Sequence, residues 1–517
     1  MTFNPDRFAL RLSEEELWKT TLWVFIGSYF LLALGLLVIS TFSFDTWSVY
    51  ELAQTPGQRF FEANTSRAYY ISDSLYSTAF APLWPVVIAL FTPITENVYG
   101  SYIASFVCYA GFAIAAEELG RRAFNRRGLG LLSALLLLRY AGVRSDLGAG
   151  RSIPMFLMEL ACVGCLLFRM ERASPRRVFA IGLLAGMMAM TRFDAIPSAL
   201  VVLLGVIVLG VRDRRLLLVF LGFFLAISPW ILYSWVHFHR VFAMDSGGAA
   251  LSVDPNTFKL DFTVEKQQTL LDAPGAFLGK ILHNFPQLVG AVSYAFVASI
   301  FGPIILFVTI VAIYRFESRR PPRRWDQRHR GLLLMALVGI APLSGYLLTG
   351  YTEQRYFSAT IWIAQFLGLG YVSRTLWRYP VVAFWLVIIG GLASVAVLRR
   401  SIKSDPIANI RQELDRRDID ALTRCLEKAG GELGDPVLFR EASPVNPVKF
   451  GALTRWRTLT LPSNWLKLDR ASQNAFLKTY GAQFVVGNVP ADEAPLIAGS
   501  TGVACPVPLR RIATPSF

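Results

Sequence analysis

The chain has little charge for its length. Only 17% of its 517 residues are Asp, Glu, Lys or Arg, whereas a soluble domain carries about 25%. Hydrophobic residues make up 54% of the sequence, and the mean hydropathy is +0.45. Several apolar runs are long enough to cross a lipid bilayer, which takes about 20 residues. The composition therefore argues against an ordinary soluble enzyme and indicates an integral membrane protein.

Histidine and cysteine are scarce. The chain has four His and five Cys, and none of them follows the spacing of a zinc site. Cys162 and Cys165 lie inside an apolar run, so we interpret them as packing residues of a helix. Cys425 and Cys505 lie in the C-terminal part. Their spacing leaves two alternatives open, a disulfide between them or two separate buried thiols.

Motifs of nucleotide-using and hydrolytic enzymes are also absent. The sequence has no Walker loop, no GxGxxG turn between a strand and a helix, no nucleophile elbow and no zinc motif. This argues against a nucleotide-driven pump and against a cytosolic nucleotide-binding enzyme. We therefore expect no cofactor and no metal ligands among the site residues, and no residue pattern indicates a divalent metal.

Arginine is concentrated in short loops between the apolar runs. The formal charge of +15 would suggest a nucleic-acid partner in a soluble protein. In a membrane protein, arginine-rich loops mark the cytoplasmic side. We therefore predict a bacterial inner membrane protein without a nucleic-acid partner. The loops predicted to be cytoplasmic are 117–128, 169–177, 211–215, 315–330 and 373–380.

The order of the apolar runs predicts about eleven transmembrane helices, with the N-terminus in the cytoplasm and no cleaved signal peptide. The first span is Leu17 to Thr41. The segment Phe80 to Thr92 is short and broken by proline, so we interpret it as an in-plane or re-entrant piece. Leu129 to Val143 is predicted to run outward to a short outer loop, 144–152.

The sequence changes character after the last apolar run. We predict an all-α transmembrane domain over residues 1–400, with a first outer loop at 42–98, and a small soluble α/β domain over 401–517. In the second domain SDPIANIRQELDRRDIDALTRCLEKAG (404–430) has a helical pattern, and DPVLFRE and AQFVVGNV are typical of short strands. The odd number of spans places this domain on the outer, periplasmic side.

The first outer loop gathers acids, arginines and aromatic residues. Asp45 follows the first span closely and lies between Phe44 and Trp47. A carboxylate in apolar surroundings has a raised pKa and can act as a general base. On local features alone, a helix cap for the following segment SVYELAQ is the favoured interpretation of Asp45. Asp73 is the second acid of the loop.

Five arginines lie on the outer side in this topology, where arginine should be depleted. Guanidinium groups bind phosphate in a bidentate manner. For each arginine taken singly, a side chain that reaches lipid headgroups is the favoured alternative. For the set, together with Asp45, Asp73 and Asp146, we expect one shared polar cavity. The candidate phosphate-binding or substrate-binding residues are Arg59, Arg67, Arg144, Arg151, Arg355 and Tyr356.

Two further features lie near the ends of apolar runs. Asp194 is interpreted as structural and paired with Arg192. Four aromatic residues could line a sugar site, although aromatic residues are common at membrane interfaces. They are Tyr69, Tyr70, Tyr76 and Trp84.

At these residues the chain resembles the GT-C class of membrane glycosyltransferases. The likeness is closest to arabinofuranosyltransferase-like and aminoarabinose transferase-like members, of the family 39 and 83 type, and it covers about the first 370 residues. Each motif is weakly specific, whereas their order is more informative. The matching pieces are FDTWSVYELAQ, AFAPLWPVVIAL, GRRAFNRRG, RSIPMFLMEL, GLLAGMMAMTRFDAIPSALVVL, SPWILYSWVHFHRVF and EQRYFSATIW.

The resemblance implies an inverting transfer of a sugar from a polyprenyl-phosphate donor to a glycan, lipid or protein of the cell envelope. It implies that Asp45 is the base and that Arg355 and Tyr356 lie at the outer mouth of the cavity. Many members have two adjacent acids in the first loop, but Thr46 follows Asp45 here. Asp73 either fills the second role or that role is absent, which leaves a metal requirement open.

A second class of function stays open beside the transferase. A non-catalytic flippase or transporter for lipid-linked sugars, or an envelope-assembly protein, would also be a polytopic membrane protein. Transporters place polar residues at the midplane, often at broken helices within an internal repeat. The sequence shows few charges within its apolar runs and no evident repeat. The identity of the sugar and of the acceptor, the oligomeric state and the role of the C-terminal domain do not follow from it.

Overall fold

We analysed a computed structural model of the chain. Apart from isolated residues, the structure describes residues 13–39, 65–66, 81–95, 99–168, 174–209, 214–242, 270–298, 327–350, 354–376, 408–432, 435–439, 456–460, 468–487, 497–500 and 508–512. The chain forms two compact units. The first comprises Met1–Ser40, Tyr102–Leu232 and Leu282–Pro406, and the second comprises Thr41–Ser101, Tyr233–Ile281 and Ile407–Phe517.

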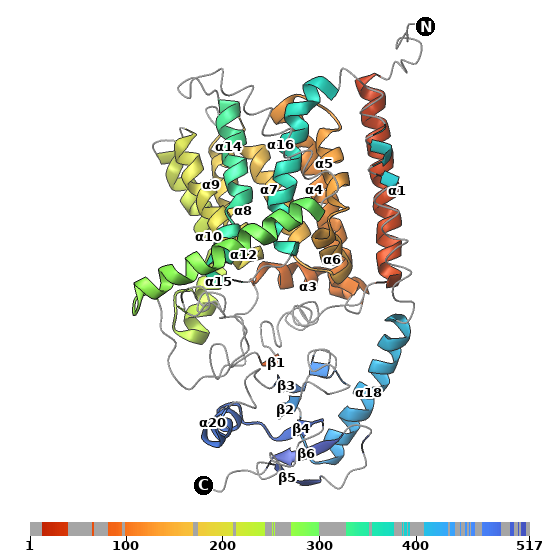
Figure 1. The fold of residues 1–517 in the computed structure, drawn as a ribbon, viewed down its shortest axis with the longest axis vertical. Coiled ribbons are helices and arrows are strands. Elements are labelled where there is room, and N and C mark those ends of the chain that lie inside the picture. Colours follow the sequence, from red (N-terminus) through yellow and green to blue (C-terminus); the bar gives the residue numbers. More distant parts are fainter. Residues whose placement is uncertain are drawn as a thin grey trace. The chain divides into compact units, whose positions relative to one another are not determined.

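The first unit is built from helices (Figure 1). Its neighbouring pairs include α7 with α8, α8 with α9, α9 with α14, and α16 with both α5 and α14. The helices that lie wholly or mainly in this unit are α1 (Glu14–Ile39), α4 (Tyr99–Phe124), α5 (Leu129–Leu137), α6 (Ala141–Ala149), α7 (Ile153–Leu167), α8 (Pro175–Thr191), α9 (Ile196–Val208), α10 (Arg214–Phe238), α12 (Pro274–Ala298), α14 (Gln327–Ile340), α15 (Leu343–Thr349), α16 (Ser358–Leu376) and the 3-10 turns η4 (Phe193–Ala195) and η6 (Gln354–Phe357).

The length and hydropathy of several helices are those of membrane spans. Within the described residues, four helices are long and apolar enough to cross a membrane, and a fifth span is formed if the bent pair α6 and α7 counts as one. The four are Glu15–Leu36, Tyr99–Phe124, Arg215–Phe238 and His329–Thr349. The chain is therefore a multi-spanning helical membrane protein.

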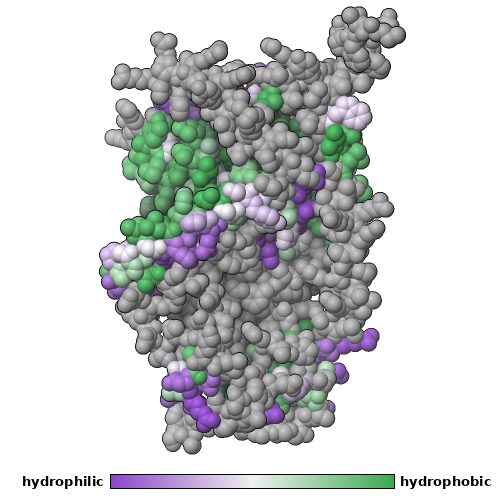
Figure 2. Space-filling model, viewed as in Figure 1, coloured by the Kyte–Doolittle hydropathy of each residue, from purple (hydrophilic) through white to green (hydrophobic). Residues whose placement is uncertain are grey.

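The outer surface of the bundle is apolar. Figure 2 shows hydrophobic side chains gathered over the side on which α9 and α14 lie. A helix surface that stays apolar while exposed is suited to lipid rather than to water. The exposed apolar residues of α9, α10 and α14 include Leu200, Leu204, Ile207, Leu217, Leu221, Phe224, Leu225, Leu333 and Leu337.

Small residues let the helices approach closely. A Cβ atom added at Gly182 of α8 would lie 1.9 Å from the carbonyl oxygen of Val219 on α10. One added at Gly130 of α5 would lie 2.0 Å from the carbonyl oxygen of Ala116 on α4. Close backbone contact through glycine is a common means of packing helices in membranes, where the hydrophobic effect does not hold one helix against another.

The segment 129–152 differs from its sequence-based prediction. Instead of one helix over Leu129 to Val143 and a loop over 144–152, α5 ends at Leu137 and α6 begins at Ala141. The backbone N–H groups of Arg139 and Tyr140 donate to the carbonyls three residues earlier, which closes a tight turn. This break leaves Arg139 partly exposed, whereas a continued helix would carry its charge further into the apolar bundle.

The second unit contains a six-stranded sheet of order β1-β3-β2-β4-β6-β5. The first four strands in this order are parallel, and β6 and β5 are antiparallel to their neighbours. The strands are β1 (Thr65–Ser66), β2 (Pro436–Phe439), β3 (Arg457–Thr460), β4 (Phe484–Val486), β5 (Ile497–Ser500) and β6 (Leu509–Ile512). The strands predicted from DPVLFRE and AQFVVGNV are confirmed as β2 and β4.

Three helices of the second unit are described. α18 (Ala408–Lys428) confirms the predicted helix, and α20 (Arg470–Tyr480) connects β3 to β4. Asp469 caps α20, because its carboxylate accepts from the backbone N–H of Ser472 at 2.8 Å, and this bond lowers the pKa of the carboxyl group. α3 (Leu83–Thr95) has 13 residues and is about 20 Å long, too short to span the roughly 30 Å of a hydrocarbon core.

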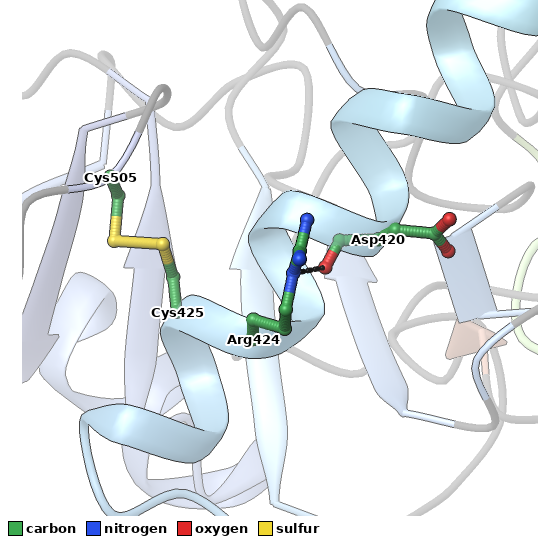
Figure 3. The surroundings of a disulfide bond; sticks show 4 residues. All are labelled: Asp420, Arg424, Cys425 and Cys505. Atoms are coloured by element: carbon green, nitrogen blue, oxygen red, sulfur yellow. Dashed lines mark hydrogen bonds between the residues drawn. A yellow bond between two sulfur atoms is a disulfide. The ribbon is translucent and has the colours of Figure 1, made fainter.

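Residues from α18 and from the strands form one hydrophobic core, and a disulfide at its edge links α18 to the segment between β5 and β6. Cys425 of α18 is bonded to Cys505, which lies between β5 and β6, with their Cα atoms 6.0 Å apart (Figure 3). This resolves the two alternatives left open by the sequence. The core residues include Leu422, Leu426, Val437, Phe439, Trp456 and Phe484.

The disulfide is expected to stabilise the second unit. It closes a loop with a sequence separation of 80, and loss of a native disulfide typically costs about 2–4 kcal/mol. We expect Cys425→Ser and Cys505→Ser to lower the denaturant midpoint of this unit by similar amounts. The measurement is limited proteolysis of residues 401–517 in urea, with Cys108→Ser as the matched control. A midpoint that is unchanged in both variants would contradict the expectation.

Candidate active site

Polar side chains of the first unit meet where its short elements end. The elements are α6, η4, α15 and η6, and α6 packs against η6. Figure 1 shows α6 and α15 at the same end of the bundle. The helices are interrupted at this end of the bundle. α6 meets α7 at a bend of 116°. Gly150 ends α6 and Gly350 ends α15, both in the left-handed conformation, which glycine adopts without strain.

An ion pair joins α8, η4 and α15. The guanidinium of Arg192 donates to both carboxylate oxygens of Asp194, at 2.9 and 2.8 Å. The phenol of Tyr346 donates to the same carboxylate. The side chains of Arg192 and Asp194 are only 13% and 21% exposed, so the pair is largely withdrawn from water. The predicted pairing of Asp194 with Arg192 is confirmed.

The ring of Tyr356 lies close to two arginines. The guanidinium carbon of Arg192 is 5.1 Å from the centre of its ring, and that of Arg355 is 4.9 Å away. Arg355 also donates to the Tyr356 hydroxyl at 3.1 Å. The ring of Tyr346 stacks on Tyr356 with centroids 4.8 Å apart. The cation–π contacts fix both guanidinium groups beside one aromatic surface.

Asp146 of α6 completes the cluster. It is fully buried, and Arg355, Arg151 and Arg192 all act on it electrostatically. Its Oδ1 atom accepts from Arg151 at 3.5 Å. Its Oδ2 atom is buried and has no hydrogen-bond partner among the described residues. A buried carboxylate oxygen without a partner is unfavourable, so this atom is available to a ligand that can donate a hydrogen bond.

α6 and η6 approach too closely for a side chain between them. A Cβ atom added at Gly142 would lie 2.6 Å from the Cα atom of Arg355 and 2.7 Å from the ring of Tyr140. Burial raises the pKa of the Tyr140 phenol, so this group stays a neutral hydrogen-bond donor. Gly142 therefore allows the backbone that carries Arg355 to lie against the helix that carries Asp146.

The cluster has an excess of positive charge. Three arginines, Arg151, Arg192 and Arg355, lie with two carboxylates, those of Asp146 and Asp194, so the net formal charge of these five groups is positive. Two tyrosines add aromatic surface and hydroxyl groups. An anion with hydrogen-bonding oxygens, such as a phosphate, matches this combination of charge and donors. Among the described residues, no group of three His, Cys, Asp or Glu side chains could hold a metal ion.

The structure brings some of the predicted site residues together and leaves others apart. Arg151, Arg355 and Tyr356 lie in the cluster with Asp146. Arg144 does not act on Asp146, and its charged neighbour is Arg139. The other four predicted residues lie outside the described part of the chain. They are Asp45, Arg59, Arg67 and Asp73.

Sequence reasoning missed the part that Arg192 and Tyr346 play. Arg192 was assigned only to an ion pair, yet it also contacts Tyr356 and acts on Asp146. Tyr346 had no assigned role. The only signal in the sequence is position, because both residues lie at the end of an apolar run, within TRFDA and SGYLLTGY.

Two solved structures have a similar fold. They are those of ArnT from Cupriavidus metallidurans bound to undecaprenyl phosphate and of the same protein in the apo state, with TM-scores of 0.54 and 0.55. In each comparison 12% of residues are identical, and the match covers 95% of this chain and 97% of the other. No family model matches the chain. No curated protein matches its sequence.

The resemblance to the GT-C class is thus confirmed at the level of the fold. The chain shares its fold with these ArnT structures. In this chain, that fold combines a multi-spanning helical part with a small C-terminal α/β part. The match extends over nearly the whole length of both chains.

Proposed function

We propose that the protein is a membrane glycosyltransferase that moves a sugar from a polyprenyl-phosphate donor to an acceptor of the cell envelope. The observation that carries the proposal is the cluster of Arg151, Arg192, Arg355 and Tyr356 around the buried carboxylate of Asp146. Its excess positive charge and aromatic surface suit a sugar phosphate. The ArnT structure bound to undecaprenyl phosphate, which shares the fold, supports this class of donor.

The reaction needs a leaving phosphate and a base. In the proposed transfer, an acceptor hydroxyl attacks the anomeric carbon, the bond from that carbon to the phosphate oxygen breaks, and polyprenyl phosphate leaves. Asp45 takes the hydroxyl proton, and Asp73 assists in the same loop. Arg355 and Arg151 hold the phosphate as its negative charge grows. Fixed charges at the site of developing charge supply a large part of enzymatic rate enhancement.

The arrangement also assigns a role to Asp146. Its unpartnered Oδ2 atom can accept a hydrogen bond from a sugar hydroxyl while Arg151 neutralises its other oxygen. Tyr346 and Asp194 do not contact substrate in this scheme. They hold Arg192 in place through the ion pair and the phenol hydrogen bond. Arg59 and Arg67 would contact the donor from the first outer loop.

We propose that residues 1–400 form the transmembrane domain and that 401–517 form an extracytoplasmic domain, with the N-terminus in the cytoplasm. The disulfide between Cys425 and Cys505 supports an oxidising compartment, such as the bacterial periplasm, for the second domain. The site would then open on the outer side of the inner membrane, where envelope acceptors are found.

A carrier of lipid-linked sugars is the second candidate function. One observation favours it: Glu159 is fully buried in the middle of α7, where it accepts from Thr191 at 2.7 Å. A buried acid within a span is typical of an ion or proton pathway. In the transferase, Glu159 serves instead to join α7 to the end of α8, next to Arg192.

The test is sugar release by the purified protein in lipid. We expect wild-type protein to release radiolabelled sugar from decaprenyl- or undecaprenyl-phosphate donors. Arg355→Ala should lower kcat/KM by about 10–100-fold, because it removes a charge-assisted contact worth roughly 1.5–3 kcal/mol. Arg126→Ala is the control.

Two outcomes would count against the transferase. Saturable donor binding without turnover, weakened by Arg355→Ala, would favour the carrier. Turnover that Arg355→Ala leaves unchanged would place the phosphate elsewhere.

A further inference from the structure

At the break between α5 and α6, two arginines have no acidic group acting on them among the residues that the structure describes. The Nε atoms of Arg139 and Arg144 are both buried and have no hydrogen-bond partner in the described part of the chain. The charged group that acts on Arg144 is Arg139, and the effect is repulsive. Both side chains are half-buried.

This pair is separate from the candidate active site. Arg144 and Asp146 are two positions apart on α6, and residues at that spacing project from different sides of a helix. The basic groups that act on Asp146 are Arg355, Arg151 and Arg192, and neither member of the pair is among them. The ion pairs of the active site therefore leave Arg139 and Arg144 uncompensated.

The energetics of the pair favour an anion. Two like charges in a partly desolvated setting repel each other more strongly than they would in water. An anion between them replaces repulsion with two attractive contacts. Guanidinium groups offer paired N–H donors that match the oxygens of a phosphate, and such contacts are stronger than neutral hydrogen bonds. Because α1 packs against both α5 and α6, a membrane span lies beside the pair.

We propose that Arg139 and Arg144 form a second anion site, which takes a phosphate group apart from the donor phosphate of the active site. The phosphate comes either from a lipid headgroup or from free phosphate in solution. The proposal reassigns Arg144 from the donor site and does not depend on the transfer reaction.

The experiment measures anion binding to the full chain in nanodiscs of phosphatidylcholine. One arm uses radiolabelled inorganic phosphate in equilibrium dialysis, and the other uses phosphatidic acid counted by native mass spectrometry. We expect R139Q/R144Q to weaken binding by about tenfold or more in one arm, because the two changes remove both charge-assisted contacts to the anion. The arm that responds identifies the source of the phosphate.

Three variants make the result specific. R126Q/R127Q removes two arginines elsewhere on the chain and should leave this binding unchanged. R355Q removes an arginine of the candidate active site, so it should affect only phosphate bound there and leave the binding that R139Q/R144Q removes. R139K/R144K keeps both charges and should retain most of it. Thermal unfolding shows whether R139Q/R144Q is folded. If it is not folded, the single variant R144Q replaces it, and the same loss of anion binding is expected.

Two results would overturn the proposal. One is equal binding by wild type and R139Q/R144Q in both arms. The other is a loss in R355Q as large as that in R139Q/R144Q, because the two sets of arginines would then form one site.

Discussion

Asp45→Asn is expected to lower sugar transfer by about 10²–10⁴-fold, the range that general base catalysis supplies. Asparagine keeps the shape of the side chain but cannot take a proton from the acceptor hydroxyl. Donor binding should change little, because the arginines of the candidate active site contact the phosphate. The measurement is kcat and KM for the donor, and we expect the loss in kcat.

The matched control for this prediction is Asp73→Asn in the same loop. It tests whether the second acid shares the role of Asp45, and a smaller loss is expected. The alternative for Asp45 is a helix cap, and asparagine caps helices about as well as aspartate. Near-normal turnover in Asp45→Asn would therefore support the cap and refute its assignment as the base.

Asp194→Ala is expected to destabilise the first unit by about 3 kcal/mol. Removing one partner of a buried ion pair costs roughly 3–5 kcal/mol, because the other charge stays buried without compensation. The lower end applies here, since the side chains of Arg192 and Asp194 keep 13% and 21% exposure. The change also removes the acceptor of the Tyr346 phenol. The measurement is thermal unfolding of the protein in detergent.

A double-variant cycle separates the ion pair from general packing. Arg192→Met with Asp194→Leu removes both charges, so the pair leaves no unmatched charge behind. We expect this double variant to be more stable than Asp194→Ala. If the loss of stability in the double variant equals the summed losses of the single variants Arg192→Met and Asp194→Leu, the two side chains have no coupling energy. Arg215→Met is the control, on a different part of the bundle.

Local sequence patterns predicted several elements correctly because their cause is local. The apolar runs, the helix that begins near residue 408 and the strands β2 and β4 follow from hydrophobicity and periodicity alone. The pairing of Arg192 with Asp194 was also predictable, because the two residues are two positions apart at the end of a helix. The GT-C resemblance, carried by the order of weak motifs, is confirmed in the fold.

The break between α5 and α6 was not predictable from hydrophobicity. Leu129 to Leu138 is apolar apart from Ser133, and nothing in this run marks where the helix stops. Local backbone bonds close the turn at Arg139 and Tyr140, and the helix after it lies against Arg355, which is distant in sequence, at Gly142. The sequence placed Arg144 and Arg151 in one set, whereas in the structure Arg151 acts on Asp146 and the charged group that acts on Arg144 is Arg139.

The sequence by itself determined that this is a basic, polytopic helical membrane protein with a small α/β part at its C-terminus. Hydrophobic length and charge are properties of each segment and need no partner. The three-dimensional arrangement was needed to show which arginines act on one carboxylate, that two of them contact the ring of Tyr356 and that Cys425 is bonded to Cys505. These contacts join residues from separate helices and strands. They form only because the helix breaks and the close approaches of the backbone bring those elements together.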